Sequence, residues 1–239
     1  MENSLERIIP DQLAANGIIG GETLRLHLER YQYAGRFLLP GNVADVACGV
    51  GYGTYLLATE CSEKINIIVG VDDEDGAIAY ARTRYAHSKI KFIVSDAMQF
   101  HSPIELNNIV SLETIEHLPN PVFFIQSISK QLPPGARFIA SAPVTPSMDA
   151  NPYHLHDFSI KSFKKLFTIS GFKEIDAFTQ VQRYNPFLIM RRNKKGSRML
   201  RRNILKYYLK NPNKLLLRLR SIVLDGFCNK YLVAVFEKL

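Results

Sequence analysis

The residues best suited to chemistry follow the first apolar run of the chain. The run 43–46 leads into a turn with glycines at Gly49, Gly51 and Gly53, where backbone N–H groups can contact a ligand that side chains would exclude. A strand, a glycine turn and a helix start in this order predict a nucleotide-cofactor site. A dinucleotide fingerprint needs its third glycine one position later, where Thr54 stands.

Carboxylates mark the ends of three apolar runs. Asp45 lies in the first run, Asp72 ends the second and can accept both ribose hydroxyls, and Asp96 ends the third and can accept a bond from an adenine amino group. Because no Lys or Arg lies among the glycines, this charge suits a cationic ligand such as S-adenosylmethionine. The alternative is that Asp45 caps backbone N–H groups and that the glycines only make a tight turn.

These pieces, in this order, resemble the class I S-adenosylmethionine-dependent methyltransferases. The resemblance covers about residues 24–190 and the last nine, with departures at Ala44 and Ala136 that touch no chemistry. It implies that Met98 packs on adenine and that Glu113 contacts the methionine end of the cofactor or a backbone N–H group. The expected cofactor-binding residues are Asp45, Gly49, Gly51, Gly53, Asp72, Asp73, Asp96, Ala97, Met98 and Glu113.

The elements that position these residues alternate between strand and helix, which predicts an α/β, doubly wound, mostly parallel sheet with ligands at the carboxyl ends of its strands. By resemblance, a seventh strand near the C-terminus inserts antiparallel between the fifth and the sixth. We expect one methyltransferase domain over 1–239 with an N-terminal helical cap over 1–40. Strands are predicted at about 43–47, 66–71, 91–95, 107–112, 137–142, 172–181 and 230–237.

Composition limits where the chain works. Its three cysteines are not closely spaced, which argues against disulfides or zinc and favours a reducing cytoplasm. The N-terminus carries acids and does not resemble a secretory signal. No window approaches the roughly 18 apolar residues of a membrane-spanning helix.

Candidate catalytic residues follow the fourth predicted strand. Methyl transfer needs mainly an acceptor held in line with the methyl group, but a hydroxyl acceptor benefits from a base. His117 is the first candidate for that base, and His154, in a later loop, is the second. The structural alternative for His117 is a ring packed on the next helix and bonded to the backbone.

Two segments resemble methyltransferases that act on sugars and surface polysaccharides. They are 27–34, ahead of the first strand, and 151–159, where an extended chain would put both histidines on one side. Alternatively, Ser159 caps the next helix, the histidines bond loop backbone and Arg30 pairs on a solvated face. We expect no metal, since no close carboxylate or thiol completes the histidines. The candidate acceptor residues are Arg30, Tyr31, Tyr153, His154 and His156.

A basic segment interrupts the fold between Arg191 and Lys230. It holds thirteen Lys or Arg and one acid, a balance of +12 against +8 for the whole chain. Helical spacing of leucines, broken at 211–213, predicts two basic amphipathic helices. Such helices suit an anionic membrane surface, RNA, or a helical cap or dimer contact whose charges face water.

The sequence therefore predicts a cytoplasmic S-adenosylmethionine-dependent methyltransferase that acts on a hydroxyl of a small-molecule or glycan acceptor. A lipid-linked acceptor would explain a peripheral attachment at the inner face of the membrane through 191–230. Three rivals remain, namely a quinone or aromatic lipid O-methyltransferase, an RNA methyltransferase and a non-catalytic cofactor-binding module. The acceptor and the oligomeric state are not predicted.

Overall fold

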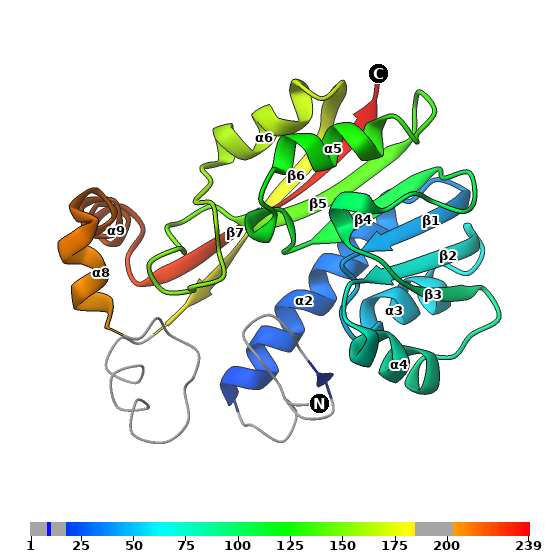
Figure 1. The fold of residues 1–239 in the computed structure, drawn as a ribbon, viewed down its shortest axis with the longest axis horizontal. Helices are drawn as coiled ribbons and strands as arrows, with labels where there is room; N and C mark the ends of the chain where they lie inside the picture. The colour runs from blue at the N-terminus through cyan, green and yellow to red at the C-terminus, as the bar shows by residue number, and fades with distance from the viewer. Residues whose placement is uncertain (1–8, 11–17, 185–202) are drawn as a thin grey trace.

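Seven strands form one sheet, and helices cover both of its faces (Figure 1). The computed structural model describes residues 9–10, 18–184 and 203–239. Each predicted strand is present, with ends within two residues of those expected. The strands are Gly41–Val46 (β1), Ile65–Asp72 (β2), Ile90–Val94 (β3), Asn108–Leu112 (β4), Arg137–Pro143 (β5), Phe172–Arg183 (β6) and Cys228–Lys238 (β7).

The strand order is β3-β2-β1-β4-β5-β7-β6. Strands β1 to β5 pair in parallel, whereas β7 runs antiparallel to both β5 and β6. The predicted fold class is confirmed, as is the place of the last strand, which only the resemblance implied. The chain leaves β1 toward one edge and returns through β4 to the other. Ligands of open α/β sheets bind where the order reverses in this way.

Helices connect the strands. The longer ones are Ile18–Phe37 (α2), Tyr52–Glu60 (α3), Asp75–Arg84 (α4), Pro121–Ser129 (α5), Ile160–Thr168 (α6), Ile204–Lys210 (α8) and Pro212–Asp225 (α9), and two 3₁₀ turns are Ala97–Gln99 (η2) and Ile115–His117 (η3). Asn120 caps α5, and Ser159 caps α6 in a capping box with Ser162, the structural role that its sequence allowed. No described helix is long and apolar enough to cross a bilayer.

The core lies on both faces of the sheet. Phe124 of α5 and Phe167 of α6 pack with Phe138 on one face, while Tyr31 of α2 and Leu57 of α3 pack on the other. Because the central strands are buried on both sides, they read as continuous apolar runs. The helices leave the ends of the strands uncovered, and these ends form two edges of the sheet, one at the amino ends of the parallel strands and one at their carboxyl ends.

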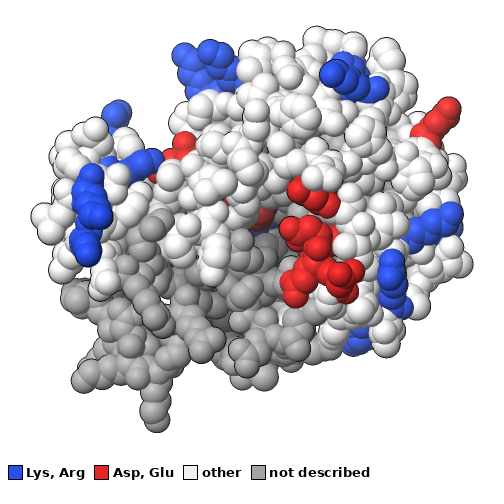
Figure 2. All heavy atoms as spheres, in the orientation of Figure 1, with Lys and Arg blue, Asp and Glu red and all other residues white. Residues whose placement is uncertain are grey.

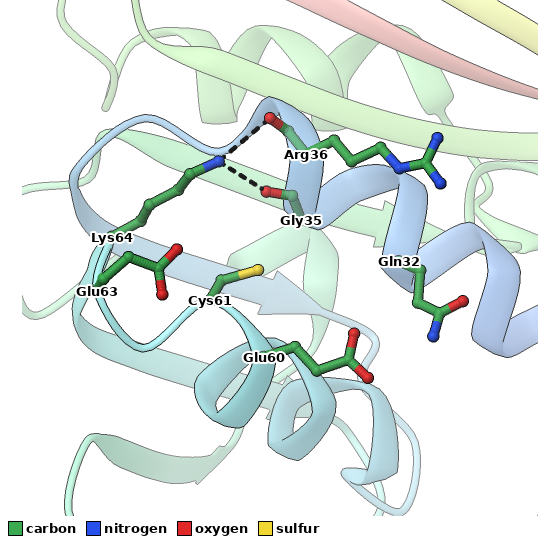
Figure 3. A pocket seen from close by; sticks show the side chains of 7 residues that line it. All are labelled: Gln32, Gly35, Arg36, Glu60, Cys61, Glu63 and Lys64. Carbon is green, nitrogen blue, oxygen red and sulfur yellow. Dashed lines mark hydrogen bonds between the residues drawn. The ribbon is translucent and has the colours of Figure 1, made fainter.

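The two edges of the sheet differ. At the amino end of β2, a hollow lies between the end of α2 and the turn after α3, where Lys64 Nζ donates to the carbonyls of Gly35 and Arg36 at 3.2 Å each (Figure 3). At the opposite edge, acidic side chains gather near the carboxyl ends of β1, β2 and β4 (Figure 2). All the predicted cofactor residues belong to this second edge.

Candidate active site

A buried carboxylate lies beneath the glycine turn. Asp45 of β1 is fully buried and accepts a hydrogen bond from Thr54 Oγ1 at 2.6 Å. The Tyr31 hydroxyl lies 3.4 and 3.3 Å from its two oxygens. Burial raises the pKa of Asp45 to about 7, although both hydrogen bonds favour the ionised form. The carboxylate joins β1 to the first turn of α3 and to α2.

The three glycines of the turn have different structural roles. Gly49 has φ +58° and open space where a Cβ would be, and its N–H donates to Asp72 Oδ2 at 2.9 Å. A Cβ on Gly51 would lie 2.7 Å from the Phe92 ring, and one on Gly53 would lie 1.9 Å from the Tyr31 ring. Gly49 therefore leaves the opening that an adenosyl group needs, and its neighbours permit packing behind the turn.

The remaining predicted cofactor residues lie along the same edge. Asp73 and Asp96 are exposed, and Ala97 and Met98 are half-buried. Asp96 Oδ1 accepts from Met98 N at 2.8 Å and thereby caps η2. With the opening at Gly49 and the Asp72 carboxylate, these residues fit S-adenosylmethionine, whose sulfonium makes its methyl group transferable.

Glu113, directly after β4, connects this edge to a buried cation. It has φ 54°, a left-handed conformation that is uncommon for non-glycine residues, and Ser141 Oγ donates to its Oε1 at 2.7 Å. Arg30, 1% exposed, lies with Nη1 3.6 Å from Glu113 Oε2. It donates from Nε to Gln180 Oε1 at 2.7 Å and stacks over Tyr231. Its Nη1 is buried and has no hydrogen-bond partner within the described chain, so the Glu113 carboxylate is the charge that balances it.

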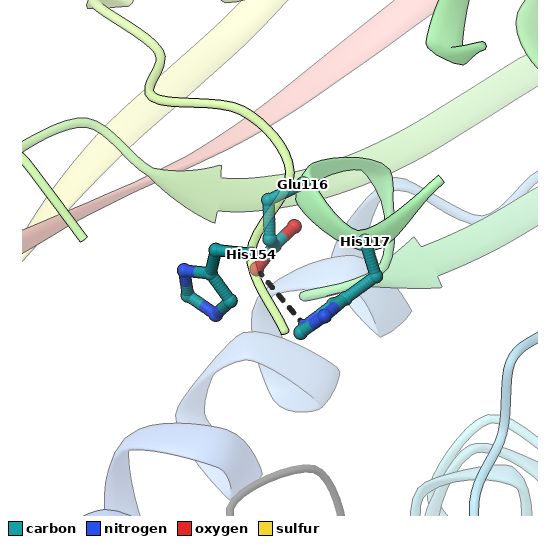
Figure 4. Close-up of side chains that lie close together, drawn as sticks. All are labelled: Glu116, His117 and His154. Atoms are coloured by element: carbon teal, nitrogen blue, oxygen red, sulfur yellow. Dashed lines mark ion pairs between the residues drawn. The ribbon is translucent and has the colours of Figure 1, made fainter. Parts of the chain in front are cut away.

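The predicted catalytic histidines lie together. The rings of His117, from η3, and His154, from the loop before α6, meet edge to face with centroids 4.6 Å apart (Figure 4). His117 Nδ1 lies 3.3 Å from the Tyr153 carbonyl and His154 Nδ1 lies 2.7 Å from Ser147 Oγ. Burial and the charge of His117 lower the pKa of His154 to about 4. His154 is therefore a poor proton acceptor near neutral pH.

The other candidate acceptor residues do not join this pair. His156 Nε2 lies 2.9 Å from the Leu118 carbonyl and its ring stacks on Phe158, so it holds the loop to η3. The Tyr153 side chain is 57% exposed. Tyr31 contacts Asp45 on the cofactor side of the site, as described above. Arg30 is buried, not on a solvated face.

Three further residues shape the pair, and the sequence assigned none of them a role, although Glu116 and Asp157 lie in the two candidate loops. Glu116 is 1% exposed, and its Oε1 lies 4.0 Å from His117 Nε2. Ser147 contacts His154, and Asp157 Oδ1 accepts from Ser147 N at 2.8 Å. Asp157 stands one residue after His156, and this proximity was the available signal. Nothing in the pattern signals that Glu116 turns inward.

Two cations of α9 contact the loop of the site, while leucines of α8 and α9 face solvent. Arg218 forms a bidentate pair with Asp149, with Nε and Nη2 at 2.7 and 2.6 Å, and Lys214 pairs with Asp157 at 2.7 Å. Leu216 is 64% exposed. The suggestion that the charges of this segment all face water is wrong for Lys214 and Arg218. Residues 191–202 of the predicted insertion lie outside the described residues.

Comparison with known proteins identifies the family. A family model described as a methyltransferase domain matches residues 41–198. The chain belongs to the methyltransferase domain family. Together with the relatives and solved structures described next, this match confirms the predicted class and its cofactor, S-adenosylmethionine, while the resemblance to sugar and polysaccharide enzymes stays a prediction.

Curated relatives of this methyltransferase are distant. A Mycolicibacterium smegmatis protein described as a probable S-adenosylmethionine-dependent methyltransferase is 26% identical over 64% of this chain and 60% of its own length. Phosphoethanolamine N-methyltransferase 1 of Arabidopsis thaliana is 27% identical over 74% of this chain and 38% of its own. The chain thus spans less than two thirds of the length of either relative.

Solved structures share the fold. The YcgJ protein of Bacillus subtilis aligns over 88% of this chain and 98% of its own, with a TM-score of 0.64 and 12% identity. N-methyltransferase NodS of Bradyrhizobium japonicum, solved with S-adenosyl-L-homocysteine, aligns over 91% and 86%, with a TM-score of 0.57 and 15% identity.

Replacing Gly53 with alanine should destabilise the methyltransferase. The new Cβ would overlap the Tyr31 ring, and overpacking of this kind costs about 1–3 kcal/mol. Gly21→Ala is the matched control, because Gly21 lies in α2 with nothing within 4 Å of a Cβ, and alanine should stabilise that helix by about 0.5–1 kcal/mol. Urea unfolding measures both, and equal effects of the two variants would contradict this packing.

The pKa of Asp45 predicts a pH-dependent stability. The unfolded carboxyl ionises near its ordinary value of 3.8 and the folded one near 7, so between these values the folded chain holds more protons and the free energy of unfolding falls as pH rises. Asp45→Asn should therefore gain stability relative to wild type between pH 4.5 and 8 in thermal unfolding. Asp73→Asn, at an exposed carboxylate, should show no such trend. A stability difference between Asp45→Asn and wild type that does not change with pH would refute the raised pKa of Asp45.

Proposed function

We propose that this methyltransferase transfers the methyl group of S-adenosylmethionine to a hydroxyl of a small-molecule or glycan acceptor. The observation that carries the proposal is the His117–His154 pair, 4.6 Å between ring centroids, in the loops that follow β4 and β5. Strand β4 pairs with β1, which carries Asp45 and leads into the glycine turn. His117 thus follows the strand next to the predicted cofactor site, and His154 follows β5, which pairs with β4.

Proton removal is the step that these residues serve. Sugar hydroxyls have a high pKa, so a positioned base assists as the oxygen takes the methyl group. His117 is the proposed base, and the buried Arg30 holds Glu113 in place at the end of β4. Relatives named for phosphoethanolamine make an amine the competing acceptor.

Removing the base should slow transfer and spare cofactor binding. His117→Ala should lower kcat by on the order of a hundredfold or more, with the Kd for S-adenosylmethionine unchanged. His101→Ala, an exposed histidine outside the site, should match wild type. Turnover and calorimetric affinity measure the two effects, and an unchanged kcat for His117→Ala would remove this residue from the mechanism.

We further propose that the acceptor is linked to a lipid and that α8 and α9 bind the anionic inner face of the membrane. Five apolar residues of these helices are more than 60% exposed, namely Leu205 78%, Leu209 84%, Leu216 64%, Val223 83% and Leu224 68%. Exposed cations accompany them at Lys206, Lys210 and Arg220. Leucines that insert among lipid tails beside cations that meet phosphates are typical of interfacial helices.

Vesicle pelleting tests the attachment. Wild type should pellet with phosphatidylglycerol vesicles at low salt and less so with phosphatidylcholine alone. Leu216→Asp/Val223→Asp should abolish pelleting without loss of fold, because both side chains are exposed. Ile169→Asp, at a 53% exposed apolar residue after α6, is the control. Pelleting by the double variant at the wild-type level, or salt-sensitive binding to RNA in place of vesicles, would contradict the membrane proposal.

A further inference from the structure

Three groups with metal-ligating chemistry converge at the histidine pair. One ligand atom each from Glu116, His117 and His154 lies within 4.8 Å of the other two (Figure 4). The sequence argued against a metal because no carboxylate completed the histidines, and η3 supplies that carboxylate by turning Glu116 inward. Two imidazoles and one carboxylate form a donor set that zinc enzymes use.

Both histidines are oriented as metal-ligating histidines usually are. The Tyr153 carbonyl can only accept, so His117 Nδ1 at 3.3 Å carries the proton and Nε2 carries the lone pair. His154 Nδ1 lies 2.7 Å from Ser147 Oγ, which in turn lies 3.4 Å from Asp157 Oδ1. Hydrogen bonds of this kind at the remote nitrogen fix the tautomer and leave Nε2 for a metal.

Hydrogen bonds and one ion pair fix the loop that carries His154. Asp157 accepts from the backbone N–H groups of Ser147 and Met148 at 2.8 and 3.0 Å, and Lys214 of α9 pairs with it at 2.7 Å. The loop backbone also bonds to η3, with Leu155 N donating to the Glu116 carbonyl at 2.8 Å. The three groups therefore sit on two segments that are tied to each other.

We propose that Glu116, His117 and His154 bind one divalent cation of the zinc class, with an open position for the acceptor oxygen. Nitrogen donors favour such an ion over Mg²⁺ or Ca²⁺. Ligands at about 2.0–2.2 Å from zinc require small side-chain rotations from the present separations. The acceptor part of this inference rests on the proposed function, but the binding of the ion does not.

A bound ion would let the acceptor hydroxyl lose its proton without His117 acting as the base. His117 Nε2 cannot hold a metal and a proton at once, so in the metal-bound enzyme His117 is a ligand and the ion lowers the pKa of the coordinated hydroxyl. The proton goes to solvent water, the acceptor oxygen bonds the methyl carbon, and the sulfur keeps the electron pair of the broken bond. No oxidant or reductant is needed.

Metal binding to the whole chain, without cofactor or acceptor, tests the site independently of methyl transfer. After dialysis against a chelator and then metal-free buffer, the protein should bind one Zn²⁺ by calorimetry and give a cobalt d–d spectrum with Co²⁺, but not bind Mg²⁺ at the same concentration. Glu116→Gln and His154→Ala should each weaken binding at least tenfold, while His101→Ala should bind as wild type does. Circular dichroism checks that the variants fold.

Two results would overturn the inference. Zinc that fails to bind, or that binds equally to His154→Ala and wild type, would exclude the site whatever the acceptor is. Methyl transfer that continues at the full rate in the metal-free enzyme would exclude the activating role, while leaving the proposed hydroxyl methylation and its free base intact.

Discussion

The buried carboxylate of Asp45 is the interaction on which the site depends. It is joined to Thr54 at the start of α3 and to Tyr31 of α2, so one side chain ties a strand, a turn and a covering helix together. Burial without a cationic partner is costly for a carboxylate, and its raised pKa expresses that cost. A cationic ligand at this edge would offset the cost of burying the carboxylate, and S-adenosylmethionine carries such a positive charge on its sulfonium.

Two further carboxylates, the buried Asp149 and the half-buried Asp157, organise the histidine side of the site. Asp149 and Asp157 lie in the loop that carries His154, and their partners, Arg218 and Lys214, come from α9. The same helix pair turns its leucines outward. Cations therefore hold the helices to the loop, and the apolar side chains stay available for another surface. Under the proposed function, the element that meets the membrane is also the element that supports the histidines.

Much of the fold followed from the sequence because strands buried on both faces leave continuous apolar runs. Asp72, Asp96 and Glu113 were placed correctly at strand ends, because each of them ends or directly follows an apolar run that forms a strand. The spacing of the glycines alone could not show that Gly53 leaves room for the Tyr31 ring. Helical periodicity groups the cations of α9, but it does not say that Lys214 and Arg218 face inward, because that depends on acids almost sixty or more residues away. For the same reason the approach of Glu116 to His154 was not predictable.

The central claim is that methyl transfer occurs to an oxygen at the histidine pair. The most direct measurement incubates the protein with methyl-labelled S-adenosylmethionine and fractionated cell extract, and then determines by NMR which atom carries the label. The account predicts a methyl ether on a glycan or small molecule, enriched in the lipid-linked fraction. Label on nitrogen or on RNA, or no label in any fraction despite cofactor binding, would contradict it.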